Sequence, residues 1–358
     1  MQRVLWLILI LVGPLAGCYA TSQALHQNEL FNTRRKVVEV LASPQTPQKT
    51  KDQLAKVRQV LAYAEAQGLN TAGAYGYLIE TKQPMVSYLV QAARDDQLAF
   101  ITWWFPLVGK VPYLGFFRQD ECNAEAARLK ALGYDVSTGG VGAFSSLGWF
   151  DDPIFSSMLE RGDAELAHLF FHELTHRTLW IPGAPTFNEN LAEYTAFVLT
   201  REYLASQGNA AALAQLTHYE RKQRDKQLFT VWLQALKADL TAIFQDKQKL
   251  GRAQVLQQKR TLLQKYLDPP LKPAFAVVDY VGKDSWNNAS VLGASLYAPD
   301  IARFAKAYGC LGAPRSIRQY LAALRVAADL GPDPFIGLDS LCRPLEYPTG
   351  EEHANVDR

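Results

Sequence analysis

Phe171-His172-Glu173-Leu174-Thr175-His176 is the stretch that decides how the rest of the chain is interpreted. His172 and His176 stand four residues apart, so on an α-helix both imidazoles project from one face and can reach one ion. Glu173 is rotated by one residue, so its carboxylate can lie beside such an ion without binding it. This is the H-E-x-x-H arrangement of zinc peptidases, in which the glutamate is the general base.

A third protein ligand must come from elsewhere, because catalytic zinc keeps three protein ligands and one water. The segment Ile181-Pro182-Gly183-Ala184-Pro185 breaks the helix, and a second helix is predicted to begin at Thr186 or Phe187. Glu189 lies in its first turn and Glu193 lies one turn later on the same face. We expect Glu189 to be the third zinc ligand, and Glu193 to accept a hydrogen bond from the far ring nitrogen of a metal-bound histidine.

Other roles for these residues stay open in the sequence. Glu193 could be the ligand in place of Glu189. Thr186-x-x-Glu189 is also a capping box, in which the glutamate bonds back to the backbone of Thr186. His168 repeats the four-residue step, but about 12 Å of helix axis separates it from His176, so one ion cannot bind all three histidines. We therefore expect His168 to be a flanking or core residue.

Peptide hydrolysis at this motif needs further groups. Glu173 would take a proton from the attacking water and pass it to the leaving amine. An oxyanion donor is usually a tyrosine or histidine, and Tyr297 is the candidate, with a packed core tyrosine as the alternative. A carboxylate that binds the substrate amine could be Glu121, Asp151 or Asp152, and the sequence does not select among them. Exopeptidase and endopeptidase action both remain open, as does a non-catalytic zinc site.

Several stretches resemble the bacterial predicted-aminopeptidase family of zincin-like proteins, often classed as lipoproteins. The resemblance runs from about Leu30 to Tyr308. The stretches that carry it are Trp104 to Gly109, Val111 to Phe117, Ser146 to Pro153, His172 to His176, Phe187 to Glu189, and Trp286 to Ala289. It implies a zinc-dependent aminopeptidase that binds one Zn²⁺ per chain and takes a peptide substrate.

The pattern from Asn188 to Glu193 also resembles the gluzincins, in which Asn-Glu supplies the third ligand and an acid four residues later orients a histidine. Many gluzincins carry aspartate at that later position. The Gly-Ala-Met-Glu-Asn motif, with which one large aminopeptidase family binds the substrate amine, is absent.

The segment from Met1 to Cys18 predicts an export signal. Val4 to Val12 is almost wholly apolar, and Leu15-Ala16-Gly17-Cys18 places small residues before a cysteine. This predicts a lipoprotein acylated on Cys18 and tethered to a membrane of the bacterial envelope, facing the periplasm. Tyr19 in place of aspartate favours the outer membrane. The alternative, an uncleaved helix, has an apolar run too short for the ~30 Å hydrocarbon core.

Composition describes an ordinary globular chain of 358 residues, with 48% hydrophobic and 20% charged residues. The net charge of +2 gives no sign of a nucleic-acid surface. Of the four cysteines, Cys310 and Cys342 could pair in an oxidising compartment, which would leave Cys122 free.

The expected fold is α+β, mostly α: a zincin-like metallopeptidase with a small antiparallel or mixed sheet beside the H-E-x-x-H helix. We expect a signal peptide over 1–18, a helical segment over 19–70, a peptidase domain over 71–340 and a tail over 341–358. The domain divides into a sheet part at 75–150, zinc helices at 163–206 and a C-terminal helical part at 207–340.

Periodicity predicts the elements within these segments. Two helices are expected over 21–68, strands at 77–79, 86–90, 98–103 and 134–138, a helix at 120–132, and the zinc helix at 163–179 with Asp163 as its N-cap. The glycine-rich run at 139–143 would lead into a strand edge to which an extended substrate adds, or would be a plain loop.

Overall fold

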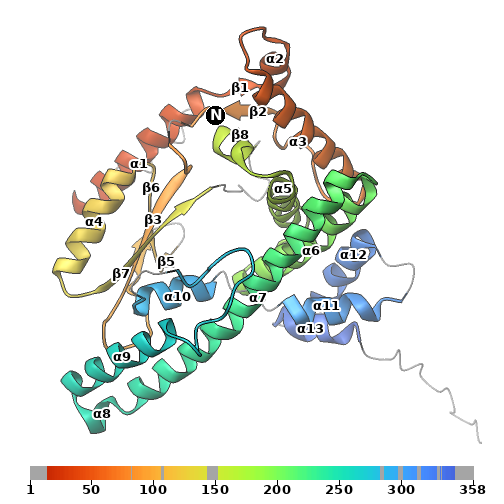
Figure 1. Ribbon diagram of the computed structural model, residues 1–358. Helices are drawn as coiled ribbons and strands as arrows, with labels where there is room; N and C mark the ends of the chain where they lie inside the picture. The colour runs from red at the N-terminus through yellow and green to blue at the C-terminus, as the bar shows by residue number, and fades with distance from the viewer. Residues whose placement is uncertain are drawn as a thin grey trace, which may run out of the picture.

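The computed structural model describes residues 14–81, 83–105, 109–142, 152–282, 286–296, 301–312, 316–328, 331 and 333–342 (Figure 1). Helices predominate over three small sheets in these residues, which confirms the expected α+β, mostly α class. Within the same residues, no helix is both long enough and apolar enough to cross a bilayer.

A three-stranded antiparallel sheet forms one side of the molecule. Its strands lie in the order β6 (Leu114–Phe116), β3 (Ser87–Ala93) and β7 (Asp135–Val141). Tyr88, Val90 and their neighbours on one face pack against α4 (Gln119–Ala131), which lies with α1 (Pro14–Asn32) outside the sheet (Figure 1). Because side chains alternate along a strand, the opposite face turns toward the interior.

The H-E-x-x-H motif lies on α5 (Asp163–Thr178), and the two glutamates lie on α6 (Pro185–Ser206). These helices pack closely on each other and share the main hydrophobic core. Gly162 is the N-cap of α5, so the expected cap at Asp163 is wrong: its carboxylate instead binds Lys56 at 2.6 Å. Pro185 begins α6, where its missing N–H removes no helical hydrogen bond.

The chain stays helical after α6, as expected. The long α7 (Ala210–Gln245) crosses the molecule, and α8 (Lys247–Leu250) and α9 (Arg252–Leu267) return along it (Figure 1). Further on lie α10 (Asn288–Leu296), α11 (Ile301–Cys310), α12 (Ile317–Ala328) and α13 (Pro334–Ser340). A disulfide joins Cys310 to Cys342, the pairing that the sequence had left open, and Cys122 is free and buried.

The expectation of two N-terminal helices is wrong. Three helices are present, α1, α2 (Val37–Ala42) and α3 (Gln48–Ala66). The break between α1 and α2 arises because Arg35–Lys36 forms the strand β1, which pairs with β2 (Tyr77–Ile79). The other side of β2 pairs with β8 (Ile154–Phe155), and the short 3₁₀ helix η1 (Ser156–Glu160) follows β8. A pairing partner some forty residues away overrides the local helical pattern.

The strand expected at 98–103 is also wrong in extent. Only an isolated bridge between Ala93 and Phe100 forms there. The extended segment begins at Trp103, where β4 (Trp103–Phe105) pairs with β5 (Gly109–Val111) as a separate ladder.

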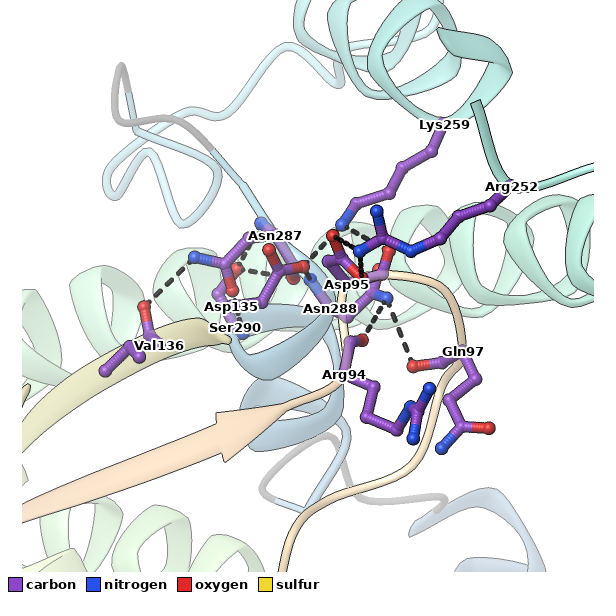
Figure 2. A network of polar contacts seen from close by, with 10 residues as sticks. All are labelled: Arg94, Asp95, Gln97, Asp135, Val136, Arg252, Lys259, Asn287, Asn288 and Ser290. Atoms are coloured by element: carbon purple, nitrogen blue, oxygen red, sulfur yellow. Dashed lines mark hydrogen bonds and ion pairs between the residues drawn. The ribbon is translucent and has the colours of Figure 1, made fainter. Parts of the chain in front are cut away.

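A buried polar network fixes α9 and α10 to the start of β7 (Figure 2). The ammonium of Lys259, which is 6% exposed, lies 2.5 Å from the Asp135 carboxylate and donates to the Asp95 carbonyl at 2.9 Å. The Asn288 N–H also donates to Asp135, and the fully buried Asn288 amide donates to the carbonyls of Arg94 and Gln97. The network therefore sets where α10 begins relative to the sheet.

Replacing Lys259 with methionine should lower the free energy of unfolding by about 3–5 kcal/mol, because the Asp135 carboxylate would lose its counter-charge in a buried site. Urea denaturation measures the change. The matched control is Lys249→Met, whose ammonium also pairs with an aspartate, Asp246, but is 82% exposed and should matter by at most about 1 kcal/mol. Equal effects of the two substitutions would show that the network does not stabilise the fold.

Candidate functional site

Three side chains from α5 and α6 bring their donor atoms to one point. The Nε2 atoms of His172 and His176 are 3.2 Å apart. One carboxylate oxygen of Glu189, Oε2, lies 3.4 Å from His172 Nε2, and the other, Oε1, lies 3.5 Å from His176 Nε2. These residues form a group that could hold a metal ion, as the sequence predicted.

The turn between the helices places Glu189 opposite the histidines. Asn188 closes this turn, because its side chain accepts a hydrogen bond from the Ile181 N–H at 2.9 Å and donates to the Ile181 carbonyl at 2.8 Å. Pro185 starts α6, one or two residues earlier than expected, so Glu189 faces α5 from the second turn of the helix and not from the first. The carboxylate bonds to histidine nitrogens, and the capping-box alternative with Thr186 is not what the structure shows.

The two histidines differ in protonation. Burial and the neighbouring charge of His172 together lower the pKa of His176 to about 4, against the opposing charge of Glu189. Burial also opposes the charged form of His172, but its bond to Glu189 and the charges of Glu173 and Glu193 raise its pKa overall. His176 is therefore neutral near pH 7, the state that a metal-ligating imidazole needs.

Glu193 is a buried carboxylate that contacts two histidines of α5 and a lysine of α7. It is 7% exposed, and its Oε2 lies 3.3 Å from His168 Nε2 and 3.9 Å from His172 Nδ1. Its Oε1 accepts from the Lys226 ammonium at 2.6 Å. Burial by itself would raise the pKa of Glu193, but His168 and Lys226 hold it well below its usual range. The carboxylate faces the Nδ1 side of His172, as expected of a residue that orients a ligand.

His168, His172 and Glu193 form a second group with metal-ligand chemistry. The Lys226 ammonium already occupies one oxygen of that carboxylate, and the Tyr219 hydroxyl lies 2.8 Å from His168 Nδ1. A cation beside the carboxylate disfavours a metal ion there. The group that contains Glu189 is therefore the better metal site, and His168 flanks it, as the sequence analysis expected.

Glu173 follows His172 on α5, and its pKa is raised above the usual value of a glutamate. Burial raises its pKa, and the nearby carboxylates of Glu189 and Asp152 add to this, while His172 opposes it. A carboxylate whose pKa is raised toward neutrality is a better proton acceptor and donor in turn. This is the property expected of the general base.

A cleft of about 730 Å³ opens between the sheet and the helices α5, α7 and α10. Its lining includes His172 and Glu173 from α5, Tyr219 and Lys226 from α7, and the inner face of β3 and β7. The volume is in the range of known ligand sites. His172 and Glu173 of the H-E-x-x-H motif therefore face a cavity of this size.

The edge of β7 runs along this cleft. The Val141 carbonyl accepts a hydrogen bond from the Val86 N–H at 2.9 Å and so points toward β3. With the two-residue period of a strand, Thr138 and Gly140 direct their backbone polar groups to the other side. That side carries no strand within the described part of the chain. The Asn287 side chain binds the Val136 carbonyl at 3.0 Å and closes this edge at one end (Figure 2).

Other predicted residues have different outcomes. Tyr297 and Asp151 lie outside the described residues, and Cys18 lies in α1 with its side chain outside them. Asp152 is buried in an ion pair with Arg177 at 2.9 Å, and Glu121 lies on α4 behind the sheet, so neither belongs to the cleft lining. Tyr219 and Lys226 are site residues that sequence reasoning missed, because nothing in α7 marks them before the fold brings them to α5.

A sequence model of the family described as putative aminopeptidase matches residues 18–332. The chain belongs to this family. Among the curated proteins and the solved structures, none matches the chain. The family's name indicates peptidase activity, and the matched region includes every described wall of the cleft.

The two glutamates of α6 should differ when each is changed to glutamine. Glu189→Gln removes a ligand, so zinc uptake should fall more than for Glu193→Gln, where a loss of roughly 10–100-fold in affinity is expected. Zinc bound after dialysis against graded metal buffers measures both. Glu202→Gln, on an exposed position of the same helix, should leave affinity unchanged. The reverse ranking would make Glu193 the ligand.

Proposed function

We propose that the chain is a zinc-dependent aminopeptidase of the bacterial cell envelope. The observation that carries the proposal is the convergence of His172, His176 and Glu189 beside Glu173, at a cleft that is lined by the edge strand β7. Membership of the aminopeptidase family supports the same reaction class.

The donor set fits zinc in chemistry and in spacing. Zn–N bonds of about 2.0–2.1 Å in a tetrahedron place neighbouring nitrogen ligands about 3.3–3.4 Å apart. The two Nε2 atoms are 3.2 Å apart, close to this spacing, and each has one oxygen of the Glu189 carboxylate within 3.5 Å. Two imidazoles and one carboxylate are the ligand set of one class of catalytic zinc site, and zinc there supplies Lewis acidity and lowers the pKa of water.

The remaining steps belong to residues of the chain. Glu173 accepts the proton of the attacking water and delivers it to the nitrogen of the leaving amine. Glu193 keeps the His172 ring in the orientation that points Nε2 at Glu189. The open edge of β7 supports an extended substrate, because the polar groups of Thr138 and Gly140 are available to a peptide backbone.

The length of that edge favours exopeptidase over endopeptidase action. Only Thr138 and Gly140 are open before Asn287 binds the Val136 carbonyl, and α10 begins at once beyond it. An added strand cannot continue past this point, so a bound chain must end there. In an aminopeptidase that end is the amino terminus.

The envelope location is supported by the N-terminal sequence and by the way the next residues are held. The Tyr19 hydroxyl accepts from the Gly115 N–H at 3.1 Å, and the Phe117 N–H donates to Gln23. A lipid on Cys18 would therefore connect to the folded body with no linker. The disulfide between Cys310 and Cys342 agrees with an oxidising compartment.

Glu173→Gln tests the chemistry. It should keep zinc, since Glu173 is not a ligand, while hydrolysis falls roughly 10²–10⁴-fold with the loss of the base. Aminoacyl reporters, N-acetylated reporters and internally quenched peptides measure the rates, with Glu202→Gln as control. We expect the unmodified protein to cleave only substrates with a free amine. Equal cleavage of the quenched peptides and their N-acetylated forms would identify an endopeptidase instead.

Cys18→Ser tests the anchor. The substitution removes the acylated thiol, so the protein should move from the membrane fraction to the soluble envelope fraction. Immunoblots of fractionated cells measure the distribution, and Cys122→Ser, a change at a buried free thiol, is the control. Unchanged membrane association of the Cys18→Ser protein would point to an uncleaved N-terminal helix.

A further inference from the structure

Among the described residues that line the cleft, the Arg161 guanidinium has no counter-charge. Arg161 lies just before α5 and lines the cleft, and its guanidinium is so close to Gly142 at the end of β7 that a side chain there would collide with it. In the described parts of the chain, its buried Nε has no hydrogen-bond partner and no carboxylate forms an ion pair with it.

Lys222 and Lys226, the other two cations in the described lining of the cleft, are each paired with a carboxylate. The ammonium of Lys222 lies 2.9 Å from Glu165, and the ammonium of Lys226 lies 2.6 Å from Glu193. A guanidinium carries five N–H donors in a fork that matches a carboxylate. Of these three cations, Arg161 would therefore contribute the most binding free energy to an anionic ligand.

A second unmatched donor lies elsewhere along the same cleft. Gln91 on β3 is 4% exposed, and its Nε2 has no partner among the described residues. It lies opposite Ser137, so about 17 Å of strand separates its level from Gly142. A buried polar group normally has a hydrogen-bond partner. Unmatched donors at both levels, with the open edge of β7 between them, fit a bound peptide.

The distance between Arg161 and the proposed zinc ligand His172 can be estimated along α5. The nine residue steps from Asp163 to His172 span about 14 Å of helix. An extended chain covers this length with about four residues. An aminopeptidase holds only one residue before the scissile bond, so a group four residues away belongs to the C-terminal side of the substrate.

We propose that Arg161 binds a substrate carboxylate about four residues beyond the scissile bond, which makes short oligopeptides with a free C-terminus the preferred substrates. This inference rests on the proposed aminopeptidase function. The same chemistry could be supplied by an acidic side chain at that position in a longer peptide, and the experiment separates the two sources.

The test measures equilibrium binding to the zinc-loaded full chain carrying Glu173→Gln, so that peptides are not consumed. Alanine peptides of three to seven residues are compared as free acids and as C-terminal amides. Amidated heptapeptides with one glutamate at each position form the second arm. The acid should bind roughly 10–100-fold more tightly than the amide at the matching length, as expected of a charged hydrogen bond.

Adding Arg161→Gln should bring the ratio of acid to amide affinity to about one, while Arg161→Lys should keep part of it. Gly142→Ala, which keeps the charge but displaces the guanidinium, should also reduce the ratio. Arg201→Gln, the loss of a positive charge on the exposed face of α6, should leave it unchanged. A substitution that merely destabilised the fold would weaken acid and amide alike, so the ratio isolates the contact.

A preference for the free C-terminus identifies the α-carboxylate as ligand, and Arg161-dependent binding of an internal glutamate identifies the side chain. An unchanged ratio in Arg161→Gln, or no binding of any peptide, overturns the proposal. Selective binding through Arg161 with no hydrolysis by the unmodified protein would refute the proposed function alone. Hydrolysis without selectivity for a carboxylate would refute the Arg161 site alone.

Discussion

The buried carboxylate of Glu193 is the interaction on which the site depends. A carboxylate in such a position costs several kcal/mol unless it is paired and hydrogen-bonded. Here one oxygen binds Lys226 of α7 and the other faces His168 of α5. Three consecutive helices, α5, α6 and α7, therefore meet at one charge, and the position of His172 next to it follows from their packing. Removing any partner would leave a charge or donor unsatisfied next to His172.

The sheet serves the site in a different way, through one face and one edge. Its outer face is covered by α4, so only the inner face and the edge of β7 are available to a ligand. The Asp135 network fixes the start of α10, and Asn287 in turn occupies the Val136 carbonyl. Stability and site shape are coupled here, because the residues that bury Lys259 also determine how much of the strand edge stays open.

The sequence predicted those parts of the site that depend on local geometry. Four-residue spacing on a helix and the break at Ile181 to Pro185 were enough to bring His172, His176 and Glu189 together. Roles that depend on tertiary contacts were not predictable: Tyr219 and Lys226 reach His168 and Glu193 only because α7 crosses α5. The same reason explains the errors in the fold. Arg35–Lys36 becomes a strand through pairing with β2, and 98–103 lacks a partner strand beyond the bridge at Phe100.

Charge is distributed unevenly along the cleft, and this gives a bound chain a direction. Near the metal ligands each carboxylate has a nearby cation or histidine, which leaves little net charge to attract or repel a peptide backbone. Beyond Glu165 and Lys222, which neutralise each other, stands the guanidinium of Arg161. A peptide has a cationic end and an anionic end, so its amino terminus is disfavoured at Arg161 and its carboxylate is favoured there. The closed end of β7 at Asn287 limits the chain on the other side. Under the proposed function, the Arg161 guanidinium, which is unpaired among the described residues, and the occupied Val136 carbonyl would orient a peptide in this cleft, with no need for a dedicated amine-binding motif such as the one that the sequence lacks.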